Sequence, residues 1–218
     1  MTYLTDIATL ARKDLLLELR SRDTVPAMLL FVVSTLVVFN FALPADAGAA
    51  AAYGLLWIAL VFTALLGLTR AFVAEREQRI LDALVLTPCD RSAIWVGKGV
   101  SVVAFLLLAE AVALPAFGLF FQPVTVEVVA AVLLANVGFA AVGTLLAAMA
   151  AAGRARELLL PLLFLPLVIP IVVGGVGASV AGDPTSTADP ARYLGFLVLY
   201  DLVFAILSWA SFEYVVTE

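Results

Sequence analysis

Six long apolar stretches, separated by short polar segments, dominate the sequence. A helix of about 20 apolar residues crosses a hydrocarbon layer of roughly 30 Å, and each stretch has that length. The predicted spans cover residues 25–43, 49–69, 99–121, 128–151, 158–180 and 193–216. The pattern therefore predicts an all-α, polytopic membrane protein in which residues 1–218 form a single domain.

Residues 1–22, ahead of the first span, follow a different pattern. Apolar residues recur on one helical face: Leu4, Ile7, Leu10, Ala11 and Leu15. Polar residues take the opposite face: Thr5, Asp6, Thr9, Arg12 and Lys13. This pattern predicts an amphipathic helix lying in the membrane interface. The alternative is a solvated tail without fixed structure.

The segment 70–98, between the second and third spans, holds five of the twelve basic residues and four of the seventeen acidic residues. Ile80, Leu81, Leu84 and Val85 recur at helical spacing among these charges, and Pro88 ends the pattern. We therefore predict a short amphipathic helix outside the membrane. Its apolar stripe needs a surface to cover it, which we expect to be another protein. The alternative is that the stripe folds back onto the membrane surface.

The basic residues also predict an orientation. Eleven of the twelve fall in residues 1–22, in the segment 70–98 or between the fourth and fifth spans, which leaves only Arg192 on the opposite side. Lys and Arg are enriched in cytoplasmic segments. We therefore predict a multi-pass protein of the cell membrane with both termini and the segment 70–98 in the cytoplasm.

Three polar side chains lie inside apolar spans. Glu110 is near the middle of the third span, Asn136 lies in the fourth, and Asp201 lies nearer the outer face in the sixth. A charge at the bilayer centre costs at least about 2.5 kcal/mol, so Glu110 must be protonated, paired or facing a cavity. It serves either a transport path or proton relay, or a hydrogen bond between helices, as we expect for Asn136. Asp201 is expected to reach the lipid headgroups.

The fifth span contains residues that disrupt helices. These are Pro161, Pro166 and Pro170, followed by Gly174, Gly175 and Gly177. Each proline removes a backbone hydrogen bond, so the helix should kink or end early. Two alternatives remain open: a kinked helix through the whole span, or a helix over 158–173 followed by a glycine-rich segment that dips back into the membrane.

Composition excludes several kinds of site. The chain is 64% hydrophobic with a mean hydropathy of +1.14, which leaves no room for a separate soluble domain. The absence of histidine excludes a His-ligated metal or haem within the chain. Lys98 follows Gly97, but the rest of a phosphate-binding loop is missing, and no basic patch is available for nucleic acid. We therefore expect no enzymatic activity, no catalytic, cofactor or metal site, and no nucleic-acid partner.

Three stretches resemble a known family. Residues 12–22 read Arg-Lys-Asp-Leu-Leu-Leu-Glu-Leu-Arg-Ser-Arg, residues 68–98 contain an acidic and basic cluster, a Leu-x-x-Leu-x-Leu-x-Pro run and a closing lysine, and residues 165–170 read Leu-Pro-Leu-Val-Ile-Pro. With its length and six spans, the sequence resembles the cytochrome c-type biogenesis protein B (CcmB) family of haem exporter permeases.

The resemblance implies a type 2 ABC transporter permease. In that family two permease copies assemble with two copies of a cytoplasmic CcmA-like ATPase, a haem-handling CcmC-like subunit and a small CcmD-like subunit. ATP would then be hydrolysed by the partner, and haem for cytochrome c maturation would be the possible cargo of the complex. The alternatives are a type 2 permease for a lipid, polysaccharide or drug, and an autonomous membrane carrier or scaffold.

The resemblance also gives roles to residues of the segment 70–98. Glu75, Arg76 and Glu77 are expected to position the segment by charge pairing, and Pro88 to set the end of the helix. The apolar stripe of Leu81, Leu84 and Val85 is expected to fill a groove of the ATPase. This segment would then be the coupling helix of the transporter.

Overall fold

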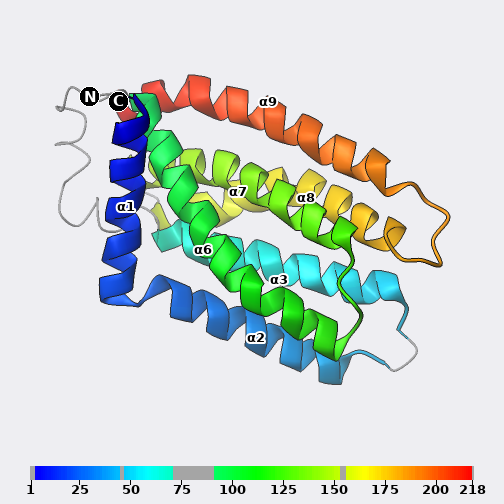
Figure 1. The fold of residues 1–218 in the computed structure, drawn as a ribbon. Coiled ribbons are helices and arrows are strands. Elements are labelled where there is room, and N and C mark those ends of the chain that lie inside the picture. The colour runs from blue at the N-terminus through cyan, green and yellow to red at the C-terminus, as the bar shows by residue number, and fades with distance from the viewer. Residues whose placement is uncertain (1–2, 45–46, 71–90, 153–155, 218) are drawn as a thin grey trace.

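The computed structural model describes residues 3–44, 47–70, 91–152 and 156–217 (Figure 1). Every regular element in these ranges is an α-helix. The helices are α1 (Tyr3–Ser21), α2 (Thr24–Ala42), α3 (Ala49–Arg70), α6 (Arg91–Phe120), α7 (Val126–Ala152), α8 (Arg156–Ala181) and α9 (Pro190–Thr217). All but α1 are long and apolar enough to cross a membrane. The predicted all-α fold with six spans is confirmed, and the chain is a multi-pass membrane protein.

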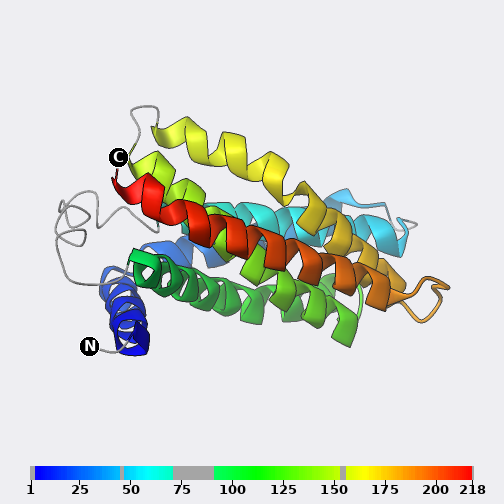
Figure 2. The same ribbon diagram turned by 90° about the horizontal axis from the view of Figure 1, so that it is seen from above.

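The six long helices run side by side in one bundle (Figures 1 and 2). Both chain termini lie at the same end of the bundle, where α3 ends and α6 begins (Figure 1). Connections between α2 and α3, α6 and α7, and α8 and α9 lie at the opposite end. The alternation of polar segments in the sequence predicted this topology.

Helix α1 lies across the end of the bundle, where it packs against α6 (Figure 1). This arrangement agrees with the predicted interfacial helix. The predicted apolar face is only partly correct, because Leu4 is 75% exposed whereas Ala11 and the charged Asp14 are buried. The face of α1 that meets α6 carries Leu10, Ala11 and Asp14, and Leu4 lies outside this contact.

Helix α6 begins at Arg91, eight residues before the predicted start of the third span. The other five spans agree with the predicted boundaries to within three residues. Residues 91–98 include the charged Arg91 and Lys98, and for this reason the hydropathy pattern assigned these residues to the preceding polar segment. They nevertheless continue the helix, because α1 covers them and Asp14 supplies a counter-charge to Lys98.

Helix α8 is continuous from Arg156 to Ala181 (Figure 2). The alternative of a helix over 158–173 followed by a re-entrant segment is therefore wrong, and the helix passes through all three prolines. The glycines serve close packing: a Cβ on Gly175 would lie 2.3 Å from Trp57 of α3, and one on Gly177 would lie 2.3 Å from Tyr193 of α9. A run of glycines in a membrane helix thus marks helix contacts here.

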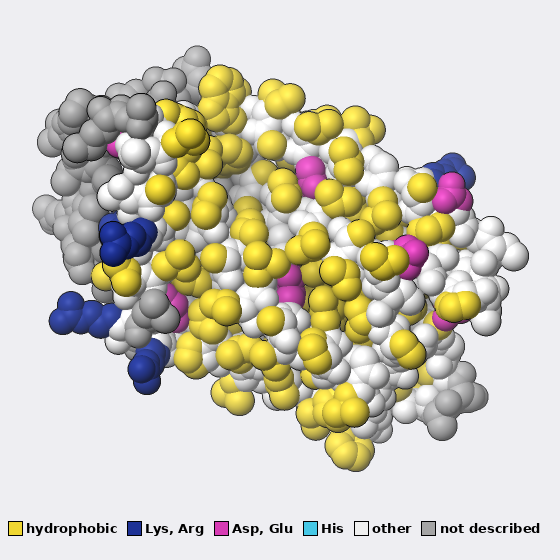
Figure 3. Space-filling model, viewed as in Figure 1, with side chains coloured by type: hydrophobic (Ala, Val, Ile, Leu, Met, Phe, Trp, Pro, Cys, Tyr) yellow, Lys and Arg dark blue, Asp and Glu magenta, His cyan; other side chains and the backbone are white. Residues whose placement is uncertain are grey.

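Helices α3 and α7 form the centre of the bundle, whereas α2 and α9 are mostly exposed. The largest fully buried side chains are aromatic: Trp57, Tyr53, Phe117, Phe139, Phe164 and Phe212. Apolar side chains cover much of the face shown in Figure 3, and Lys and Arg gather on it at the end near α1. An apolar belt of this kind suits a hydrocarbon solvent, so the bundle has the surface of a membrane protein.

Candidate functional sites in the helix bundle

A buried ion pair joins α1 to α6. Lys98 Nζ lies 2.9 Å from Asp14 Oδ2, and the two side chains are 7% and 9% exposed. Lys13, at 32% exposure, also lies 3.2 Å from Asp14 through the other carboxylate oxygen. Buried charges persist only when they are paired, so this contact fixes how α1 sits on α6.

Close packing and hydrogen bonds surround the ion pair. A Cβ on Gly97 would lie 2.9 Å from the Cβ of Leu10, so the two helices approach as closely as glycine allows. Ser101 Oγ lies 3.5 Å from the carbonyl of Ala11, at the limit of a hydrogen bond, and donates to the carbonyl of Gly97 at 3.0 Å. Helix α1 and the first turns of α6 therefore form one packed unit.

The other end of α1 is tied to α2. The Glu18 carboxylate accepts hydrogen bonds from the backbone N–H groups of Thr24 and Val25, at 2.7 and 2.8 Å. These N–H groups belong to the first turn of α2 and have no partner within that helix. Arg22 completes the turn with a φ of 56°, in the left-handed region. Helix α1 thus bridges α2 and α6.

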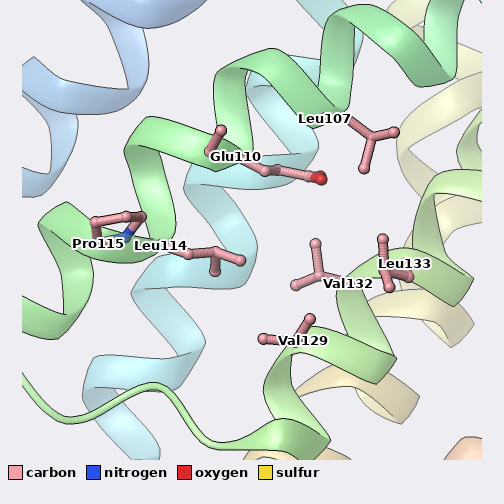
Figure 4. Close-up of a pocket in the computed structure, with 8 residues that line it drawn as sticks. Leu107, Glu110, Leu114, Pro115, Val129, Val132 and Leu133 are labelled. Carbon is pink, nitrogen blue, oxygen red and sulfur yellow. The ribbon is translucent and has the colours of Figure 1, made fainter.

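A second polar contact joins α6 to α7 in the interior of the bundle. Asn136 Nδ2 donates to Glu110 Oε2 at 2.7 Å, and the two residues are 1% and 5% exposed. The Glu110 side chain extends from α6 toward α7, between Leu107 and Val132 (Figure 4). It lines a pocket of about 340 Å³ whose other walls are apolar. The structure therefore brings together two of the three predicted intramembrane polar residues.

Asp201 lies elsewhere, between α9 and α7. It is 6% exposed, and neither carboxyl oxygen has a hydrogen-bond partner among the described residues. A Cβ on Gly138 of α7 would lie 2.7 Å from Asp201 Oδ1, so the glycine makes room for the carboxyl group. The prediction that Asp201 reaches the headgroups is wrong, because its side chain is packed inside the bundle.

The predicted coupling residues lie outside the described part of the chain. These are Glu75, Arg76, Glu77, Leu81, Leu84, Val85 and Pro88. Their roles stay predictions. The structure does describe the two helices that flank them, α3 and α6, and α1 packs against α6.

The sequence interpretation missed the pairing of Asp14 with Lys98. Asp14 had a detectable signal, since it lies three and four residues after Ala11 and Leu10, on the same helical face. A carboxylate on the apolar face of a helix needs a nearby cation. Lys98, directly before the predicted third span, was a candidate partner.

The fold and these contacts define a multi-pass membrane protein without an evident catalytic site in its described residues. Comparison with known proteins identifies its family, because residues 5–214 match the family described as CcmB protein. The chain belongs to the CcmB family, as the motifs at 12–22, 68–98 and 165–170 indicated.

Two similar proteins carry the name Heme exporter protein B. The protein from Bradyrhizobium diazoefficiens is 31% identical over 215 residues, which cover 92% of this chain and 93% of the relative. The protein from Paracoccus denitrificans is 32% identical over 184 residues, which cover 83% of each. The similarity therefore extends over nearly the whole transmembrane bundle.

Proposed function

We propose that this chain is the permease subunit of an ABC transporter complex that acts in haem delivery for cytochrome c maturation. The observation that carries the proposal is the match to the CcmB family over residues 5–214. The names of the two relatives support haem export as the process. In this role the chain is a transport subunit rather than an enzyme, and haem is cargo of the complex.

ATP hydrolysis would reside in a separate CcmA-like ATPase that docks at residues 70–98. The sequence supports this docking, because a charged segment between two spans carries an apolar stripe that needs a surface to cover it. Glu75, Arg76 and Glu77 would pair with charges of the ATPase, and Leu81, Leu84 and Val85 would fill its groove. Pro88 would end the helix before α6.

Movement of the ATPase would reach the membrane through α6. This helix begins at Arg91, directly after the proposed docking segment, and Lys98 in its second turn pairs with Asp14 of α1. Glu18 links α1 onward to α2. A rigid shift of α6 would therefore displace α1 and α2 together, so the three helices would respond to ATP as one body.

The complete complex would contain two copies of this chain, two ATPase subunits, and CcmC-like and CcmD-like membrane subunits. Both termini and the docking segment would face the cytoplasm, on the side rich in Lys and Arg. The energy of ATP would drive export of haem or its release from a carrier for attachment to apocytochrome c.

The proposal is tested by a haem stain of membrane c-type cytochromes in cells that lack the gene and in cells that regain it. Loss of covalent haem, with b-type cytochromes retained and c-type cytochromes restored by the gene, is the expected result. Unchanged c-type cytochromes would contradict the haem pathway and direct the search to a lipid, polysaccharide or drug as cargo.

A further inference from the structure

The pocket between α6 and α7 holds hydrogen-bond acceptors in apolar surroundings. Glu110 contributes a carboxyl group, and Leu107, Leu114, Val129 and Val132 contribute apolar walls (Figure 4). Asn136 donates to one carboxylate oxygen, but a carboxylate has about four acceptor positions. Most of the acceptor capacity of Glu110 is thus unused within the described residues.

Two further acceptors lie beside Glu110. Asn136 is 1% exposed, and its Oδ1 atom has no hydrogen-bond partner among the described residues. Pro115 lacks an N–H group, so the carbonyl of Ala111, which lines the pocket, loses its usual helical donor. The buried contact between Glu110 and Asn136 thus has more acceptor capacity than donors among the described residues, and the carbonyl of Ala111 lies on the same helix one residue further on.

A group with several N–H donors and a positive charge fits such a place. The ammonium of lysine and the guanidinium of arginine carry donors only, so they match a set of acceptors without competing for them. Charged residues inside membranes pair in this way with residues of opposite charge. The pocket is therefore complementary to the end of one basic side chain.

The depth of the pocket restricts where the basic group comes from. Glu110 lies ten residues before the end of α6 at Phe120, which is about 15 Å along a helix axis and half of a hydrocarbon layer of roughly 30 Å. A basic side chain is held at this depth by a membrane-spanning helix. Free amphiphilic amines place their charge at the headgroups.

A second copy of this chain does not supply the group. In the described spans, the basic residue nearest to Glu110 along α6 is Lys98, twelve residues away toward the other end of the bundle. Lys98 is already engaged with Asp14. Arg192, at the opposite end, is exposed at the beginning of α9. In the described spans, every other basic residue stands at a helix end, so we place the basic group on a different protein.

An apolar stripe beside the pocket offers a surface for a helix. Val129, Leu133 and Val137 of α7 are 38%, 49% and 46% exposed and recur at intervals of four residues. They lie on one face of α7, and the first two also line the pocket. A neighbouring helix can pack along this stripe while one of its side chains enters the pocket.

We propose that the α6–α7 pocket is the docking site for a transmembrane helix of a different protein, whose Lys or Arg side chain binds Glu110. The proposal goes beyond the coupling to an ATPase, because the partner lies within the membrane and binding needs no ATP. Failure of one proposal therefore leaves the other standing.

The test measures binding of a model helix to the full-length protein in lipid nanodiscs. The single cysteine, Cys89, carries a donor fluorophore, and a 24-residue Leu/Ala transmembrane peptide carries an acceptor. One peptide has a central lysine and the matched peptide has a central methionine. Energy transfer should show the lysine peptide binding about three- to fifteen-fold more tightly, the range that polar contacts between membrane helices span.

Two variants connect the preference to the pocket. Glu110→Gln should abolish the preference for the lysine peptide, because it removes the charge and adds donors. Asp201→Asn is the matched control at a second buried acid outside this pocket, and it should retain the preference. If Glu110→Gln is not monodisperse, Leu133→Trp serves instead, because it fills the pocket with an apolar ring.

Three outcomes would overturn the proposal. In the first, the lysine and methionine peptides bind equally tightly. In the second, the preference for the lysine peptide persists in Glu110→Gln and in Leu133→Trp. In the third, the peptides show no preference, but decylamine binds and its binding depends on Glu110. That result would assign the pocket to a free lipophilic amine rather than to a partner helix.

Discussion

The buried Lys98 is tolerated because a carboxylate from another helix compensates for its charge. Lys98 lies in a helix of high hydropathy, yet it is 5% exposed because Asp14 reaches it from another helix. Asp14 in turn has Lys13 as a second, half-exposed neighbour. Two lysines thus lie within ion-pair distance of the Asp14 carboxylate, one on α1 itself and one on α6.

Breaking this ion pair should destabilise the fold. Asp14→Asn should cost about 3–5 kcal/mol, the range for removing one partner of a buried ion pair. Adding Asp14→Asn to Lys98→Met should cost less than Asp14→Asn alone, because the pair is already broken in the Lys98→Met protein. Chemical unfolding in detergent measures both, with Arg192→Met as an exposed control. Additive effects of the two substitutions would show that Asp14 and Lys98 do not stabilise the fold through one another.

A carboxylate in the turn between α8 and α9 shows how local donors change titration. The Thr185 hydroxyl and backbone N–H donate to Asp183 Oδ1 at 2.6 and 2.8 Å. These hydrogen bonds hold the pKa of Asp183 below its usual value, because they favour the charged form.

The lowered pKa gives a pH dependence with a definite sign. The contribution of Asp183 to stability should be present above its usual pKa and lost as the pH falls through the lowered value. Carboxyl ¹³C chemical shifts measure the titration directly. Thr185→Ala should raise the pKa of Asp183, because both the hydroxyl and the order of the turn are affected. An unchanged pKa in that variant would rule out the threonine as its cause.

Helices in this bundle are positioned by the small residues that let them approach. Gly143 of α7 faces Leu68 of α3, and Gly175 of α8 faces Trp57 of α3, at distances where a Cβ would overlap. Trp57 also donates from its ring N–H to Ser179 Oγ of α8 at 3.0 Å. The α3–α8 contact thus combines a glycine cradle with a buried hydrogen bond.

Adding one methyl group should separate these two helices. Gly175→Ala would place a Cβ 2.3 Å from the Trp57 ring, so we expect a loss of about 1–3 kcal/mol of stability, as for an overpacked core. Gly195→Ala on α9 is the matched control, because nothing lies within 4 Å of its added Cβ. Thermal unfolding followed by tryptophan fluorescence compares them. Equal melting temperatures would show that α8 moves aside without loss.

The proposed coupling helix allows a separate test of element function. Leu84→Asp should uncouple ATP hydrolysis from transport while the protein remains in the membrane, because a charge would enter the apolar stripe that we propose docks on the ATPase. Leu84→Met is the control that keeps the stripe apolar. Membrane fractionation and ATP-dependent function of the complex are the two measurements. Normal ATP-dependent function of Leu84→Asp would refute the docking of this helix.

At the scale of the whole molecule, hydropathy was sufficient to predict the number of spans and which of their connections lie at the same end of the bundle. It gave no information on which helical faces meet, since an apolar helix is apolar on every side. For this reason Glu110 and Asn136 were each identified as polar residues within spans, but their contact with one another was not. The glycines of α8 suggested a possible break in the helix for the same reason: the residues that they pack against, Trp57 and Tyr193, lie on other helices and could not be identified from the sequence.

The orientation of the bundle in the membrane is predicted from the unequal distribution of basic residues between its two ends. Lys and Arg gather at the end near α1 (Figure 3), and in the described part of the chain Arg192, at the beginning of α9, is the one basic residue at the other end, so the basic end should face the cytoplasm. In intact cells, a maleimide that cannot cross the membrane should therefore leave Cys89 unlabelled. In a Cys89→Ser background, Thr187→Cys in the exposed α8–α9 turn should be labelled. The reverse pattern would invert the molecule and place the proposed ATPase docking segment on the wrong side for ATP.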